Sequence, residues 1–99
     1  MAEEYYKALG VYTHHLNEAL KKGEKYRSVA MSIRHIAERI ISANYPYSEY
    51  HLPPQINNNE LSNLSKELTT LNEEIEQHIK EANIYAKDAN KEELKRKDF

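Results

Sequence analysis

Apolar residues recur at helical spacing through the first 44 residues of the chain. Steps of three and four residues place one set on a single helix face within about residues 2–22 and a second set within about 24–44. Gly23, which follows two lysines, has the residue types that end a helix. The pattern therefore predicts two helices, 2–22 and 24–44, folded into an antiparallel hairpin. The two sets are Tyr5, Leu9, Tyr12, Leu16 and Ala19, and then Tyr26, Val29, Ile33, Ile36 and Ile40.

The second half of the chain predicts one long helix over about residues 58–88. Asn57 and Glu60 have the spacing of a capping box, and Ile56 and Leu61 have that of a hydrophobic staple. From this start the apolar positions alternate at steps of three and four, as in a heptad repeat. The seam consists of Leu61, Leu64, Leu68, Leu71, Ile75, His78, Ala82, Tyr85 and Ala89.

The length of this helix decides how the fold is completed. At about 1.5 Å per residue, an unbroken helix from residue 58 to the end would be far longer than either arm of the hairpin. Either it breaks near Asp88-Ala89-Asn90 and leaves a short helix over 90–98, or its far half projects. A projecting half would expose Ile75, Ala82 and Tyr85 to water. We therefore expect an all-α single domain, a hairpin plus one heptad-patterned helix, completed as a homodimer through the seam.

The connection over residues 45–57 contains three tyrosines and all three prolines of the chain. A loop of this length is usually functional or packed by its own side chains. Two interpretations stay open, a lid over one end of the helical core and a surface that binds a protein partner. The residues that would bind a partner are Tyr45, Tyr47, Tyr50 and Leu52.

Charge limits the macromolecules that the chain could bind. The 14 basic and 16 acidic residues give a net charge of −2, which disfavours nucleic-acid binding through bulk charge. A basic cluster at the expected hinge and along the second helix keeps this function as an alternative. Lysines near a helix end also complement the helix dipole without any ligand. The cluster consists of Lys21, Lys22, Lys25, Arg27 and Arg34.

Motifs for catalysis or metal binding are not apparent in the sequence. There is no cysteine, no Gly-x-Ser-x-Gly turn and no glycine-rich phosphate loop. His14 and Glu18 form the one histidine pair at ligand spacing, which we interpret as solvated surface. His78 replaces an apolar residue on the seam, and we interpret it as a hydrogen-bonded or boundary histidine that sets register. We expect no catalytic, cofactor-binding or metal-binding residues and no enzyme activity.

The composition resembles that of small orphan helical proteins from filamentous and rod-shaped viruses of hyperthermophilic archaea. Eight Tyr, eight Ile, ten Lys and fourteen Glu in 99 residues, without Cys or Trp, carry this resemblance. It implies a thermostable protein of the virion or of the host cytoplasm. The acidic first residues and the lack of a long apolar run also predict an intracellular protein without a membrane span. The expected function is structural or protein–protein interaction, and the alternative is a nucleic-acid-associated regulator.

Overall fold

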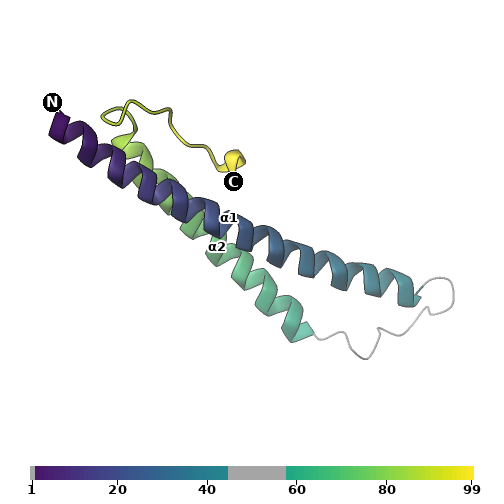
Figure 1. Cartoon of the computed structure of the whole chain (residues 1–99). Helices are drawn as coiled ribbons and strands as arrows, with labels where there is room; N and C mark the ends of the chain where they lie inside the picture. Colours follow the sequence, from purple (N-terminus) through teal and green to yellow (C-terminus); the bar gives the residue numbers. More distant parts are fainter. Residues whose placement is uncertain (1, 45–57) are drawn as a thin grey trace.

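The computed structural model describes residues 2–44 and 58–99, and these residues form a thin helical rod (Figure 1). Helix α1 spans Ala2–Asn44, helix α2 spans Asn58–Ala86, and a short 3-10 helix, η1, spans Arg96–Asp98. The described part of the chain contains no strand. The molecule measures 69 × 21 × 13 Å, so its helices lie in a single layer. The all-α prediction is confirmed.

Helices α1 and α2 pack against each other in antiparallel directions (Figure 1). Successive contacts along α1 meet earlier and earlier positions of α2, and the ribbons diverge toward Asn44 and Asn58. The antiparallel pair is therefore formed by the two halves of the chain. Tyr12 shares a cluster with Ala86, Ala19 shares one with Ile75, and Lys25 forms an ion pair with Glu67.

Gly23 does not end a helix, and the predicted break between helices 2–22 and 24–44 is wrong. Helix α1 runs without interruption for 43 residues. One glycine inside a helix costs only about 1 kcal/mol, which packing against α2 offsets. Ala19 is buried, and Tyr26, which is seven residues further on, packs against the same core cluster, so one face of α1 continues toward α2 on both sides of Gly23. The hairpin predicted within residues 2–44 is therefore a single straight arm.

Helix α2 ends close to the break predicted near Asp88-Ala89-Asn90. The Asn90 N–H donates to the Lys87 carbonyl at 3.1 Å, and the Lys91 N–H donates to the Ala86 carbonyl at 2.8 Å. This is the Schellman pattern, and Asn90 takes the left-handed backbone conformation it requires, with φ of 56°. Of the short helix expected over 90–98, only Arg96–Asp98 is helical. The expected N-cap, Asn57, lies outside the described residues.

The predicted seam is buried in part within the same chain, and its other members are half-buried. Ile75 and Ala82 are fully buried, and Leu71 is 5% exposed. Of the three side chains whose exposure motivated the predicted dimer, Ile75 and Ala82 are covered by the chain itself and Tyr85 is partly buried, so dimerisation through this seam stays a prediction. The core is small and consists of two clusters. The first contains Ala8, Tyr12, Ala82, Ala86 and Ala89, and the second contains Ala19, Ile75 and Ile79.

The C-terminal segment, residues 91–99, folds back along the helix pair (Figure 1). Leu94 packs against both core clusters, and the Arg96 guanidinium lies 4.9 Å from the centre of the Tyr26 ring. Hydrogen bonds fix the segment at four points along its length. The Tyr12 hydroxyl donates to the Glu92 carbonyl (2.9 Å), the Asn83 amide pairs with both backbone groups of Leu94 (3.0 and 2.7 Å), Arg96 donates to Asn72 (2.7 Å), and Arg27 donates to the Phe99 backbone oxygen (2.5 Å).

Gly23 is buried because the C-terminal segment contacts α1 there. A Cβ atom at this position would lie 3.0 Å from the Phe99 backbone oxygen and 3.4 Å from the Phe99 Cβ. The glycine thus permits close approach of another part of the chain.

Neither helix in the described ranges carries an apolar stretch sufficient to cross a membrane.

Candidate functional site

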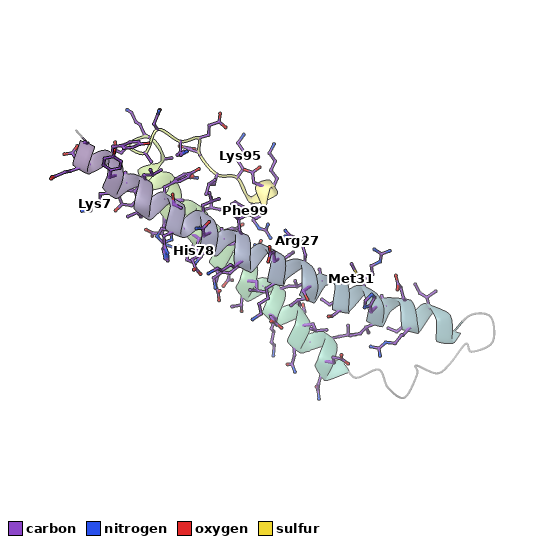
Figure 2. The ribbon with its side chains drawn as sticks, in the orientation of Figure 1. Lys7, Arg27, Met31, His78, Lys95 and Phe99 are labelled. Carbon is purple, nitrogen blue, oxygen red and sulfur yellow. The ribbon has the colours of Figure 1, made fainter. Side chains whose placement is uncertain are left out.

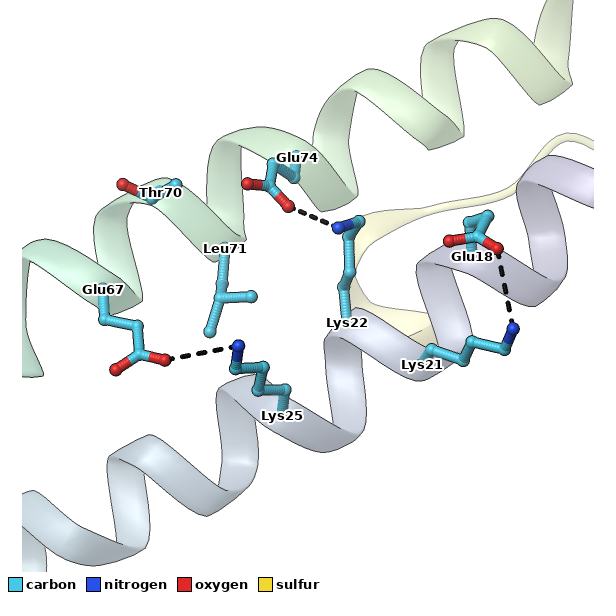
Figure 3. Close-up of a pocket in the computed structure, with 8 residues that line it drawn as sticks. All are labelled: Glu18, Lys21, Lys22, Lys25, Glu67, Thr70, Leu71 and Glu74. Carbon is cyan, nitrogen blue, oxygen red and sulfur yellow. Dashed lines mark hydrogen bonds and ion pairs between the residues drawn. The ribbon is translucent and has the colours of Figure 1, made fainter.

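A polar groove follows the contact between α1 and α2 and is the candidate functional site. It encloses about 350 Å³, and Leu71 points into it between two ion pairs that join the helices (Figure 3). Lys22 Nζ lies 2.5 Å from Glu74 Oε2, and Lys25 Nζ lies 3.6 Å from Glu67 Oε1. The remaining lining residues are Glu18, Lys21 and Thr70.

A pair of histidines joins the same two helices next to this groove. His15 Nδ1 of α1 and His78 Nδ1 of α2 are 2.8 Å apart, and both side chains are half-buried. His14 packs edge-on against His15, with ring centres 5.1 Å apart. In Figure 2, His78 projects on the side of the helix pair away from Phe99. The C-terminal segment and the histidine pair therefore occupy opposite flanks of the helix contact.

The orientation of the two rings suits a shared proton. The ring centres are 5.1 Å apart and the two Nδ1 atoms are 2.8 Å apart. The difference is about the sum of the two ring radii, as expected when both nitrogens lie on the line between the ring centres. The two Nδ1 atoms therefore point at each other, with space for one hydrogen between them. Lone pairs that bind one metal ion would instead converge on a common point beside both rings. In the described residues, no three His, Asp or Glu side chains are grouped to hold a metal.

Two groups at this site have shifted pKa values. The hydrogen bond from Lys22 lowers the pKa of the Glu74 carboxyl below its ordinary value, and burial opposes this shift. Burial lowers the pKa of His78, and the positive charges of His15 and Lys22 lower it further, whereas Glu18 opposes the shift. The site thus favours a neutral His78 beside an ionised Glu74.

The basic residues predicted to contact nucleic acid are divided between the groove and other parts of α1. Lys21, Lys22 and Lys25 line the groove, whereas Arg27 lies near Phe99 (Figure 2). Each predicted cation has an oxygen partner, so the cluster is no concentrated positive field. The remaining pairs are Lys21 with Glu18 at 3.6 Å and Arg34 with Glu38 at 3.0 Å.

Other sequence-predicted residues have different outcomes. The four candidates for partner binding, Tyr45, Tyr47, Tyr50 and Leu52, lie outside the described residues. His78 is hydrogen-bonded on the seam, as we interpreted it, and its partner is His15. His14 is exposed, and Glu18 pairs with Lys21.

Sequence reasoning missed the contact between His15 and His78. Both histidines lie at or beside an apolar stripe, His15 three residues after Tyr12 and His78 three residues after Ile75. This placement is a signal that the two side chains face other helices. Their meeting depends on the antiparallel register of α1 and α2, which the predicted break at Gly23 concealed.

The comparisons with known proteins give no relative for this chain. No protein family matches the sequence, and no curated protein or solved structure is similar to it.

Proposed function

We propose that this protein acts by binding other protein chains through the free flank of α1, and that its first partner is a second copy of itself. The observation that carries the proposal is an apolar stripe of heptad spacing on α1, which we call the α1 stripe. Steps of three, four, three and four residues keep its members on one helix face. The α1 stripe consists of Tyr6, Leu9, Leu16 and Leu20, with the exposed polar residue Thr13 at its centre.

The α1 stripe is only partly covered by the chain itself. Leu9 and Leu16 pack against the first core cluster and are half-buried. Tyr6 is 68% exposed and Leu20 is 45% exposed, so both ends of the stripe face solvent. A second helix laid along this flank would bury the ends and complete the burial of the middle. Exposed apolar side chains on one face are typical of protein interaction sites.

The thinness of the molecule supports the same conclusion. A rod 13 Å across its shortest dimension has one layer of helices, so each helix has a flank that no other helix covers. Among large side chains in the described ranges, only Ile75 is buried to below 2% exposure. Small helical chains with so little core commonly gain stability by association. A second copy would supply a helix with the same stripe.

Mass measurement by light scattering or sedimentation tests this proposal. We expect twice the chain mass of 11.6 kDa at about 100 μM, and dissociation on dilution. Leu20→Glu should give a folded monomer, because a charge would be buried in the interface. Ile41→Glu is the matched control, since Ile41 is an exposed apolar residue at the other end of α1 and should leave the dimer unchanged. A single-chain mass for the unaltered protein, or equal effects of the two variants, would contradict the proposal.

A further inference from the structure

The hydrogen bond between His15 and His78 is, among the described residues, the contact between α1 and α2 whose donor depends on pH near neutrality. Two neutral imidazoles can share it, one donating from Nδ1–H and the other accepting at Nδ1. When one of the two rings gains a proton, the charged ring donates from Nδ1–H and the neutral ring still accepts at Nδ1, so the hydrogen bond is kept. When both rings are charged, two N–H donors face each other across 2.8 Å and no acceptor remains.

Both helices contribute charged groups around the pair. On α1, His14 and Lys22 add positive charge, and Glu18 offsets part of it. On α2, Glu74 faces the pair, but its carboxylate is already hydrogen-bonded to Lys22. The Glu74 carboxylate is therefore engaged with another cation, and Glu18 is the anion that acts against the positive charge at His78.

The histidine pair lies in the middle of the helix contact. His15 follows Tyr12 of the first core cluster and precedes Ala19 of the second. His78 lies between Ile75 and Ile79, which both belong to the second cluster. Repulsion at this level acts directly on the small core that holds α1 against α2.

We propose that His15 and His78 form a proton-controlled latch, which holds α1 against α2 while their Nδ1 atoms share a hydrogen bond and releases the helices when both imidazoles are protonated. The latch goes beyond the proposed association, because it concerns contacts within one chain. It predicts that mild acid loosens the helix pair and exposes the apolar residues of the second core cluster.

The direction of the pH effect follows from proton linkage. Burial and neighbouring positive charge hold the pKa of folded His78 below its ordinary value of 6.5, so the folded protein binds this proton less readily than the unfolded chain. The lowered pKa of His78 therefore contributes stability that is fully present above pH 6.5 and is lost as the pH falls through the pKa of His78 in the folded protein. The lowered pKa of Glu74 acts only below the ordinary carboxyl value of 4.5. A window from about pH 7.5 to about pH 5.2 therefore isolates the histidines.

Urea unfolding across this window tests the latch. We expect the folding equilibrium constant of the unaltered protein to fall about fivefold between the two pH values, the equivalent of one ordinary hydrogen bond. His78→Asn should lose this pH dependence, because the amide can hydrogen-bond near the Nδ1 position but does not titrate. His35→Asn is the matched control, since His35 is an exposed histidine of α1 and its variant should keep the full decrease. An equal decrease in His78→Asn would overturn the proposal.

Nuclear magnetic resonance of the unaltered protein provides a test that needs no variant to fold. The ring signals of His78 should report its protonation below the ordinary pKa value of 6.5, because burial and neighbouring positive charge lower its pKa. The loss of helix-pair contacts should follow this protonation. Helix-pair contacts that persist after His78 is protonated would overturn the latch. The histidine signals report contacts within one chain, whereas the mass measurement reports association between chains. Comparing the two therefore distinguishes a latch without a dimer from a dimer without a latch.

Discussion

The two glycines of α1 provide a sharp test of how the C-terminal segment is held. Neither glycine has a positive φ, so alanine needs no strained backbone at either position. Replacing glycine by alanine inside a helix gains about 1 kcal/mol. Gly10 has no atom within 4 Å of an added Cβ, so Gly10→Ala should raise the free energy of unfolding by about that amount.

Gly23→Ala should gain much less than Gly10→Ala. The added Cβ would lie 3.0 Å from the Phe99 backbone oxygen, closer than ordinary van der Waals contact, so Phe99 must shift. The hydrogen bond that Arg27 donates to this oxygen at 2.5 Å would be weakened. Losing one such bond costs about 1 kcal/mol, which cancels the helical gain and leaves a net change near zero.

Urea unfolding followed by far-ultraviolet circular dichroism measures this difference. The two variants should differ by about 1 kcal/mol in the free energy of unfolding. In a chain that lacks Phe99, Gly23→Ala should recover its full helical gain, because no carbonyl oxygen then opposes the Cβ. Equal stabilisation by Gly10→Ala and Gly23→Ala in the full chain would refute the contact between Phe99 and α1.

Three further predictions concern the core and the C-terminal segment. Ile75→Ala, at a fully buried position, should cost about 2–5 kcal/mol in thermal or urea unfolding, whereas Ile84→Ala, at a position 61% exposed, should change stability by less than about 0.5 kcal/mol. Asn83→Ala should break both hydrogen bonds to Leu94 and speed hydrogen exchange at the Leu94 amide; unchanged exchange would show that the segment is held elsewhere. Burial, with smaller effects of Glu92 and Asp98, raises the pKa of Tyr12 above its ordinary value of 10.0. The folded protein therefore keeps the hydroxyl proton to higher pH than the unfolded chain does, and the free energy of unfolding should fall as the pH rises above 10.0. Tyr12→Phe should lack this part of the pH dependence.

Much of α2 was predictable because its signals are local. The apolar seam from Leu61 to Ala89 follows the helical period without a break, and Asn90 is a residue type that tolerates the left-handed conformation at a helix end. These features depend on neighbouring residues alone. The position of the break and the buried face of α2 could therefore be predicted without knowing the rest of the fold.

Gly23 misled the prediction because its role is set by a distant residue. Locally, two lysines followed by glycine are typical of a helix end. In the folded chain the same glycine accommodates Phe99, which is 76 positions away in the sequence. The C-terminal segment is held partly by side-chain to backbone hydrogen bonds, such as those between Asn83 and Leu94. Such bonds leave no apolar periodicity in the sequence, so the position of this segment on the helices could not be predicted. The register of α1 on α2, and with it the pairing of His15 with His78, follows only once α1 is known to be continuous.

The distance between the two ends of α1 tests the continuous rod that sets the register of α1 on α2, on which the histidine latch depends. Lys7 and Arg39 are exposed, and the chain has no cysteine, so Lys7→Cys and Arg39→Cys together accept two spin labels without competing sites. An uninterrupted helix places these positions about 48 Å apart. A hairpin folded at Gly23 would bring them to within about 10 Å. Pulsed electron paramagnetic resonance should show a single distribution near 48 Å, and a dominant short distance would contradict the structure.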